Sequence, residues 1–296
     1  MNRSLAALAL LTVLSASLPA QSPATPAALA EELMAVDRAF SASAANANVI
    51  ETLLGMFRDD VSMSWPKGFA MGRDEAKAAL LSNAANADTR LSWTPLRAGV
   101  SADGLHGFTL GVMTMAMPDK TVRPAKYMAY WIKDASGWKV AAYKRAPAGA
   151  GPAPTETWAP SLPARLVAAV TDTAVVDAHR ASLTSAEKGF SDDAQVMGVG
   201  PAFVKWGRDD ATNFGDPNSP GYTVGAAAIG GNLNGQAQPG PTTIEWSADR
   251  ALVASSGDLG ITFGYIRAKD GSRPPFPFFT IWRRDSPTSP WRYIAE

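Results

Sequence analysis

Few side chains in this sequence belong to the types that commonly act as nucleophiles, metal ligands or proton carriers. Cysteine is absent, and His106 and His179 are the only two histidines. The lack of cysteine excludes disulfides, cysteine nucleophiles, thiolate zinc sites and iron–sulfur clusters. Two pairs of adjacent carboxylates are present, Asp59–Asp60 and Asp209–Asp210, but consecutive residues of a strand point to opposite faces and cannot easily share a proton. We interpret both pairs as helix-ending turns, and we expect no metal site and no cofactor.

The chain also carries enough aromatic side chains to line a pocket for an apolar molecule. Rings of this kind can equally well pack into a core, so both interpretations stay open for each residue. The candidate ligand-binding residues are Trp65, Trp93, Tyr127, Trp131, Trp246 and Trp282. Three cations in matching late segments, Lys126, Arg283 and Arg284, could face an anion in such a pocket or could keep an edge strand soluble.

The N-terminal segment has the composition of an export signal. Met1-Asn2-Arg3 gives a positive start, and the apolar run from Leu5 to Leu14 that follows is too short to cross a bilayer. We predict a signal peptide over residues 1–24, cleaved after Ala20 or Ala24, and hence a periplasmic or secreted protein. No later stretch is apolar over the roughly 18 residues that a span requires. The formal net charge of zero gives no field that would attract nucleic acid.

The remainder of the chain contains two similar halves on either side of a segment rich in Pro, Ala and Gly. Residues 37–41 (Asp-Arg-Ala-Phe-Ser) recur 150 positions later as residues 187–191 (Glu-Lys-Gly-Phe-Ser), and Arg-Asp-Asp at 58–60 recurs at 208–210. Ordered matches at a nearly constant offset indicate a tandem duplication. We predict domain 1 over residues 25–146, a linker over 147–164 and domain 2 over 165–296.

Each half combines a helical period with strand alternation. Leu29, Leu33, Val36 and Phe40 are spaced three or four apart, which predicts an amphipathic helix. In the first half we predict helices over 27–46, 49–57 and 74–85, and strands over 61–65, 89–100, 106–117, 125–133 and 137–144. In the second half we predict strands over 243–254, 259–268, 276–283 and 290–295, whereas the third helical segment, from residue 225, holds too many glycines to be stable unaided. This order predicts an α+β fold, with helices on one face of a bent antiparallel sheet.

The combination of these motifs resembles the nuclear transport factor 2-like (NTF2-like) superfamily, in its SnoaL-like and DUF4440 branch. The resemblance covers roughly residues 27–146 and 183–296. It is carried by D-R-A-F at 37–40, R-D-D at 58–60, G-x-x-x-A at 72–76 and Y-W-I-K-D-A-S-G-W-K-V at 130–140. It implies two cone-shaped domains in which three helices and a curved antiparallel sheet enclose a pocket that is usually apolar. Members include ketosteroid isomerase, polyketide cyclases, dehydratases and pure binding or association domains, so the fold alone does not select a function.

The resemblance to the ketosteroid isomerases can be tested residue by residue. Their catalytic base is the aspartate of a D-P pair after the D-D motif; here the first half has Trp65-Pro66 and the second half has Asp216-Pro217. The tyrosine and the second acid of that family have no counterpart in either half. Asp216 is therefore the single candidate base, and its Gly/Asn/Ser/Pro-rich surroundings are also typical of a turn.

These observations favour an exported protein that binds a small hydrophobic or amphipathic molecule, without assured catalysis. One alternative is a proton-transferring isomerase, cyclase or hydro-lyase that uses Asp216 in domain 2. Another is a structural or interaction protein in which the two domains pack sheet to sheet as an intrachain pseudo-dimer. Divergence between the halves suggests that one copy keeps a pocket while the other supports it. The sequence leaves open whether the chain is an enzyme.

Overall fold

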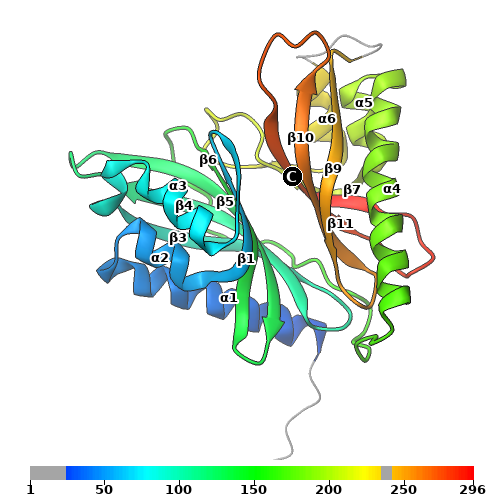
Figure 1. Ribbon diagram of the computed structural model, residues 1–296, viewed down its shortest axis with the longest axis horizontal. Helices are drawn as coiled ribbons and strands as arrows, with labels where there is room; N and C mark the ends of the chain where they lie inside the picture. The colour runs from blue at the N-terminus through cyan, green and yellow to red at the C-terminus, as the bar shows by residue number, and fades with distance from the viewer. Residues whose placement is uncertain (1–24, 235–241) are drawn as a thin grey trace, which may run out of the picture.

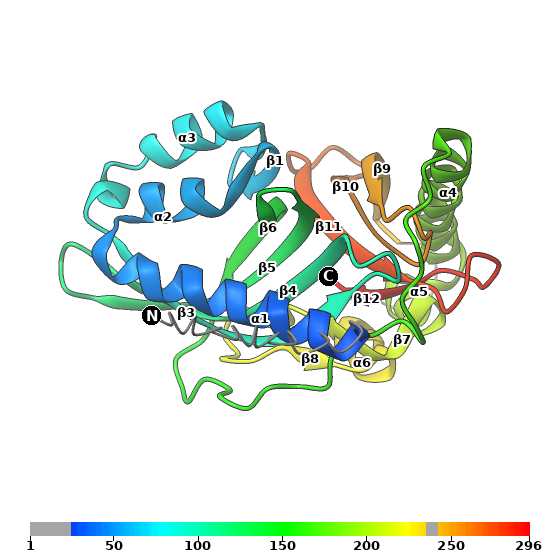
Figure 2. The same cartoon turned by 90° about the horizontal axis from the view of Figure 1, so that it is seen from below.

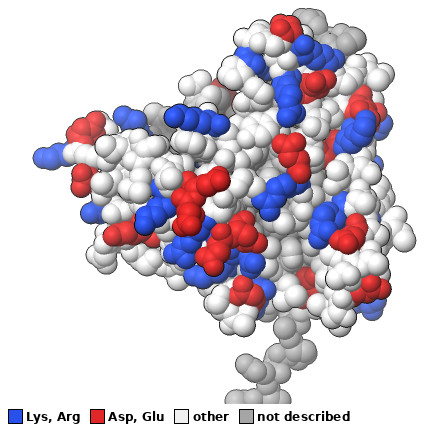
Figure 3. Space-filling view, in the orientation of Figure 1, with Lys and Arg blue, Asp and Glu red and all other residues white. Residues whose placement is uncertain are grey.

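The computed structural model describes residues 25–234 and 242–296. The predicted signal peptide, residues 1–24, lies outside the described residues. Figure 1 shows two sheets that face each other near the middle of the molecule, with α1 and α4 on their outer sides. Acidic and basic side chains are intermingled on the face drawn in Figure 3.

Domain 1 has three α-helices and a six-stranded sheet. The helices are α1 (Pro26–Ser43), α2 (Val49–Met56) and α3 (Arg73–Leu81), and the strands are β1 (Phe57–Trp65), β2 (Gly68–Met71), β3 (Arg90–Val100), β4 (His106–Ala116), β5 (Val122–Asp134) and β6 (Gly137–Pro147). The strand order is β2-β1-β6-β5-β4-β3. All neighbours are antiparallel except β1 and β6, which are parallel, so the sheet is mixed where we predicted an antiparallel one.

Domain 2 repeats this topology. Its helices are α4 (Thr173–Met197), α5 (Val199–Trp206) and α6 (Ala226–Asn234), and its strands are β7 (Gly207–Asn213), β8 (Thr223–Val224), β9 (Ile244–Val253), β10 (Leu259–Ala268), β11 (Phe276–Arg283) and β12 (Arg292–Ala295). The order β8-β7-β12-β11-β10-β9 corresponds strand for strand to that of domain 1. The predicted α+β fold in two tandem copies is therefore confirmed.

Local signals explain where the first helices begin. The side chain of Thr25 caps α1, with Pro26 at the first helical position, and Asn48 and Glu51 form a reciprocal capping box on α2. One prediction was wrong here: the Arg-Asp-Asp segments 58–60 and 208–210 are not turns but parts of β1 and β7. The chain passes directly from α2 into extended backbone at Phe57, so no separate turn is needed.

The two sheets pack against each other through one apolar cluster. In Figure 2 the two sheets lie against each other on the side away from α1 and α4. The cluster is built from residues in or directly after the strands of both domains: Phe108, Leu110, Met128, Tyr130, Ala141 and Ala142 from domain 1, and Phe214, Ala254, Leu259, Ile261, Phe263, Phe279, Ile281, Ile294 and Ala295 from domain 2. Each domain keeps its own second cluster between sheet and helices. The predicted sheet-to-sheet packing of the two halves is thus present.

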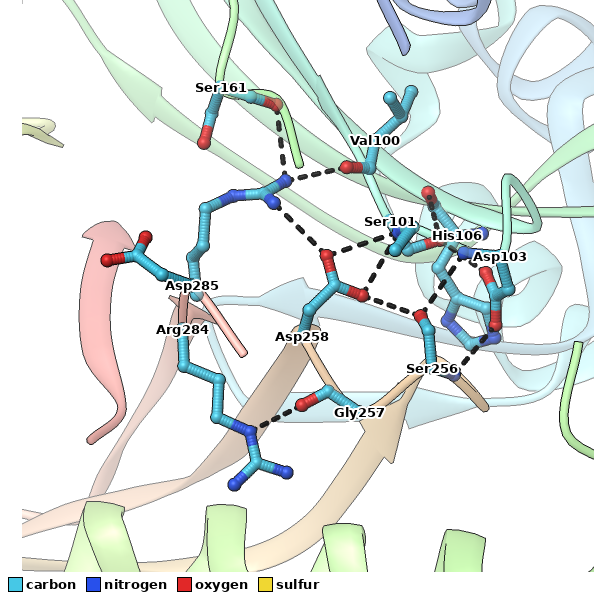
Figure 4. A network of polar contacts seen from close by, with 12 residues as sticks. Val100, Ser101, Asp103, His106, Ser161, Ser256, Gly257, Asp258, Arg284 and Asp285 are labelled. Carbon is cyan, nitrogen blue, oxygen red and sulfur yellow. Dashed lines mark hydrogen bonds and ion pairs between the residues drawn. The ribbon is translucent and has the colours of Figure 1, made fainter. Parts of the chain in front are cut away.

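Polar contacts reinforce this interface at one end. Asp258, in the turn before β10, accepts hydrogen bonds from the backbone N–H of Ala102 in domain 1 at 3.1 Å and pairs with Arg283 at 3.2 Å (Figure 4). Arg283 in turn donates to the carbonyls of Val100 and Ser161 at 2.7 and 3.1 Å. A buried guanidinium therefore joins β11 to β3 and to the segment between the domains.

The proline-rich segment between the domains runs along the outer edge of β3. The N–H of Trp158 donates to the carbonyl of Leu96 at 2.7 Å, and that of Ser161 donates to Ala98 at 2.9 Å. The segment is extended, as its composition predicts, and it covers backbone groups that an edge strand would leave open. Of the helices within the described ranges, none combines the length and the apolar character that a bilayer crossing requires.

Candidate ligand cavity and buried acids

A cavity of about 700 Å³ lies in domain 1, at the open end of its sheet. The end of β1 and the turn after it, the end of α3, and the neighbouring ends of β4, β5 and β6 form its walls. Phe276 and Pro277 at the start of β11 also border it, so domain 2 completes the wall. The apolar part of the lining consists mainly of Met63, Trp65, Leu80, Met115 and Tyr143.

Strand register explains why these side chains share one face. Met63 lies beside Tyr143 in the parallel β1–β6 pair, and Met115 lies opposite Arg123 in the β4–β5 pair. Paired residues project from the same side of a sheet, and their chain neighbours project from the other. Tyr143 and Arg145 therefore face the helices and the cavity, whereas the intervening Lys144 faces domain 2.

The charged side chains of the lining are all cationic. Lys67, Arg123 and Arg145 border the cavity, and none of its lining residues is an acid. Arg145 is half-buried, and its Nη1 is a buried nitrogen without a hydrogen-bond partner. Lys67 and Arg123 are exposed at the mouth, where Lys67 Nζ lies 5.6 Å from the centre of the Trp65 ring. The cavity thus combines an apolar wall with a positively charged mouth.

Of the six aromatic residues predicted to bind a ligand, Trp65 lines this cavity. Trp93 borders a smaller hollow of about 250 Å³ beside the linker. Its indole and the Tyr127 hydroxyl, however, are directed to a buried carboxylate: Trp93 Nε1 donates to Asp37 Oδ1 at 2.7 Å and the Tyr127 hydroxyl donates to Oδ2 at 2.6 Å. Trp131 is fully buried and donates to Thr109 at 2.9 Å. Trp93, Tyr127 and Trp131 therefore belong to the packed interior of domain 1.

Domain 2 contains the same arrangement with a longer acid. Glu187 stands where Asp37 stands in domain 1, and it accepts hydrogen bonds from Trp246 Nε1 at 2.7 Å and from Trp282 Nε1 at 3.0 Å. Trp282 also donates to Thr262 at 2.9 Å, as Trp131 does to Thr109. The predicted ligand-binding residues Trp246 and Trp282 are thus buried donors to an acid.

Burial raises the pKa of both acids, while the hydrogen bonds they accept lower it in part. Each acid lies on the first helix of its domain and accepts from strands, so it fixes that helix to the sheet. Neither Asp37 nor Glu187 was singled out from the sequence, although both begin the repeated motifs that revealed the duplication. The available signal was an acid adjoining the apolar stripe of a helix, at the same position in both copies.

Aromatic rings fill the interior of domain 2. The ring of Phe190 lies 4.8 Å from Phe203, 5.0 Å from Trp246 and 5.8 Å from Tyr293, centre to centre. The duplication places Leu53 and Met56 of domain 1 at the positions of Phe203 and Trp206. The second helix of domain 2 therefore carries larger side chains at the two positions where the second helix of domain 1 carries smaller ones.

Asp216, the candidate base, does not line the cavity. It is exposed, and its Oδ1 accepts from the backbone N–H of Asn218 at 2.8 Å and from the Asn218 side chain at 3.1 Å. This is the turn geometry that the surrounding Gly, Asn, Ser and Pro residues favour. The carboxylate is positioned to shape the loop between β7 and β8.

The ammonium group of Lys126 holds the same loop from the other domain. Lys126 is buried, and its Nζ lies within hydrogen-bond distance of four carbonyl oxygens that its three N–H groups share: those of Phe214, Asp216 at 3.1 Å, Ser219 at 3.2 Å and Gly221 at 2.9 Å. Burial lowers the pKa of Lys126. Lys126, like Arg283, is therefore an interface residue. The sequence analysis interpreted Lys126 as a pocket cation or as an edge-strand cation, and both interpretations were wrong. Arg284 donates to the carbonyl of Gly257 within domain 2.

Within residues 25–234 and 242–296, no group of three or more His, Asp or Glu side chains is placed to hold a metal ion. What the described site offers is a hollow with an apolar wall and cations at its mouth, beside a domain whose described core is packed with aromatic rings.

Comparisons with known proteins concern the fold. No model of a known protein family matches the chain, and no curated protein matches it. A solved ketosteroid isomerase-like protein from Erwinia carotovora atroseptica is 18% identical, with a TM-score of 0.32 over 38% of this chain and 92% of its own. An NTF2-like protein with a cystatin-like fold from Novosphingobium aromaticivorans is 18% identical, with a TM-score of 0.30 over 39% of this chain and 77% of its own.

A third solved structure, an NTF2-like protein from Shewanella oneidensis, is 11% identical, with a TM-score of 0.33 over 39% of this chain and 96% of its own. Each match spans about the share of this chain that one domain occupies. At this level of identity the likeness concerns the fold alone. The chain consists of two tandem α+β domains, and two of these three solved proteins, those from Novosphingobium aromaticivorans and Shewanella oneidensis, carry the NTF2-like name.

Proposed function

We propose that this protein is exported and binds one small amphipathic molecule in the cavity of domain 1, while domain 2 supports that domain through the shared interface. The observation that carries the proposal is the cavity of about 700 Å³ with its largely apolar wall. Ligand sites are typically hollows of about 300–1,000 Å³ lined by apolar and aromatic side chains, with a few polar groups. The aromatic packing inside domain 2 supports different roles for the two copies, with ligand binding in domain 1 and structural support from domain 2.

The exposed position of Asp216 gives no support to the alternative of proton transfer by domain 2. A general base must come within hydrogen-bond reach of the proton that it removes. Asp216 instead accepts hydrogen bonds from Asn218 on an exposed turn. We therefore base the proposal on binding.

Native mass spectrometry of the chain recovered from the periplasm or the medium tests the bound ligand and the export together. We expect a chain that begins after Ala20 or Ala24, with a native mass above its denatured mass by one small molecule. A chain that retains Met1 would contradict the export, and a native mass equal to the denatured mass calls for direct titration with a probe.

Titration with the neutral fluorescent probe N-phenyl-1-naphthylamine locates the binding site. Ala79 lines the cavity from α3, and its neighbour Ala78 is exposed on the same helix. We expect Ala79→Phe, which places a ring in the cavity, to weaken probe binding at least about tenfold, corresponding to about 1.4 kcal/mol, while Ala78→Phe leaves it unchanged. Equal probe binding by Ala79→Phe and the wild type would overturn the proposed site.

A further inference from the structure

The cavity of domain 1 has a charge pattern that points to the chemistry of its ligand. Its lining contains the cations Lys67, Arg123 and Arg145 and no acid. Asp119, in the turn between β4 and β5, has its pKa lowered mainly by hydrogen bonds from Thr121 and to a smaller extent by the charge of Arg123. Among the ion pairs of the described residues, none involves the side chain of Lys67, Arg123 or Arg145.

Arg145 is the cation that lies deepest in this group. It projects from β6 on the side of Tyr143, opposite Tyr127 in the β5–β6 pair. Its Nη1 is buried and has no partner in the described structure. A buried donor without an acceptor costs about 1–3 kcal/mol, and more when the group is charged, so such a nitrogen calls for a partner that the protein itself does not supply.

Two fully buried guanidinium groups differ from that of Arg145 in having carboxylate partners, although Nε of Arg283 also has no partner among the described residues. Arg97 pairs with Asp210, and Arg283 pairs with Asp258 and two carbonyls. Both guanidinium groups serve the interface between the domains. Arg145 lines the cavity instead, and its buried Nη1 donates to none of the described residues.

On the basis of the proposed function, we infer that the ligand is an amphipathic carboxylate whose head group binds Arg145, with Arg123 and Lys67 at the mouth, and whose apolar body lies against Met63, Trp65 and Met115. The planar guanidinium matches a carboxylate in shape and can donate two parallel hydrogen bonds to it. The apolar wall beside it excludes water from the body of the ligand. A charge-assisted hydrogen bond contributes about twice as much as a neutral one, so the head group sets the specificity.

Competition against the neutral probe tests this inference on the full-length protein. We would displace N-phenyl-1-naphthylamine with decanoate, decanol and decyl phosphate, which share one apolar chain and differ in the head group. In the wild type we expect decanoate to compete at a concentration about tenfold lower than decanol, the ratio expected of one hydrogen bond to a charged group. Arg145→Met should abolish this difference between decanoate and decanol, and Arg145→Lys should retain part of it.

Lys77→Met provides the matched control, because Lys77 is an exposed cation on α3 that does not line the cavity. This variant should keep the preference for decanoate. Equal competition by decanoate and decanol in the wild type would overturn the carboxylate inference, and stronger competition by decyl phosphate would replace it with a phosphate head group. A probe that does not bind, or that binds Ala79→Phe as well as the wild type, would instead overturn the proposed function.

Arg123→Met, at the exposed mouth, keeps the test decisive if Arg145→Met does not fold. We expect this variant to lose a smaller part of the decanoate preference, and no loss would count against the inference.

Discussion

At the scale of single residues, the duplication has kept one buried acid in each domain. Asp37 and Glu187 differ by one methylene, yet each accepts hydrogen bonds from an indole of a late strand or an edge strand. A buried acid is costly unless its oxygens are hydrogen-bonded, and here each acid has at least two donors. These acids therefore act on stability, by joining the first helix to the sheet, and they lie apart from the lining of the cavity.

Replacement of Asp37 tests this role. Asp37→Ala leaves two buried donors, Trp93 Nε1 and the Tyr127 hydroxyl, without their acceptor. An unsatisfied buried donor costs about 1–3 kcal/mol, so we expect the free energy of unfolding to fall by about 3 kcal/mol. Asp37→Asn keeps one acceptor oxygen and should lose less. Urea unfolding followed by tryptophan fluorescence measures both, and equal losses would show that volume rather than hydrogen bonding matters.

Comparison of the wild type with Asp37→Asn reveals the charge state of Asp37. Burial raises the pKa of Asp37 above its ordinary value of 3.8, and the hydrogen bonds from Tyr127 and Trp93 oppose this. The folded state therefore favours the protonated acid, and its stability falls as the pH rises from near 3.8 through the raised pKa. The Asn variant cannot ionise, so its stability should decline less over that range. Parallel pH profiles for the two proteins would contradict a raised pKa.

At the scale of elements, α6 shows how packing overrides propensity. The glycine-rich composition predicts a poor helix, but residues 226–234 are helical. A Cβ on Gly230 would lie 2.5 Å from the carbonyl oxygen of Gly200 in α5, whereas a Cβ on Gly231 would meet nothing within 4 Å. One glycine thus permits the close approach of α5 and α6, and the other has no such role.

The two glycines of α6 form a matched pair for mutation. Gly230→Ala should destabilise the protein by about 2 kcal/mol, because the new methyl group overlaps backbone in a packed contact. Gly231→Ala should stabilise it by about 0.5–1 kcal/mol, because Gly is a poor helix former at an exposed position. Thermal unfolding of both variants checks the expectation. Destabilisation by Gly231→Ala would mean that this residue makes a contact that the structure does not show.

The order of elements, apart from the short strands β2 and β8, could be predicted from the sequence because its signals are local. The helical spacing from Leu29 to Phe40 and the strand alternation from Val61 to Trp65 gave α1 and β1 to within a few residues. The cavity could not be assigned in this way, since its volume depends on which side chains from distant segments meet. Neither the partnerless Arg145 nor the carbonyl groups around Lys126 leave a pattern along the chain, because their surroundings come from other strands or from the other domain.

At the scale of the whole molecule, the two domains are related by contacts of the kind found in a symmetric dimer. Arg97 of β3 donates to Thr212 of β7 at 3.0 Å. Arg250, which lies 153 positions later in the corresponding strand β9, reaches Ser62 of β1 at 3.4 Å. A two-fold interface repeats each contact with the roles exchanged. Here the fusion has allowed the two copies of the contact to diverge: Arg97 is buried and pairs with Asp210, whereas Arg250 is exposed.

This divergence gives the two arginines different weights in the coupling of the domains. Arg97→Ala removes charge-assisted hydrogen bonds to Asp210, Thr212 and the carbonyl of Ala159, and we expect the free energy of unfolding to fall by about 2 kcal/mol. Arg250→Ala, at an exposed position, should change it by about 0.5 kcal/mol or less. Scanning calorimetry adds a second readout, because a weakened interface should split one cooperative transition into two. If both variants lose the same stability and keep a single transition, the two contacts have stayed equivalent, and the interface still behaves as that of a symmetric pair.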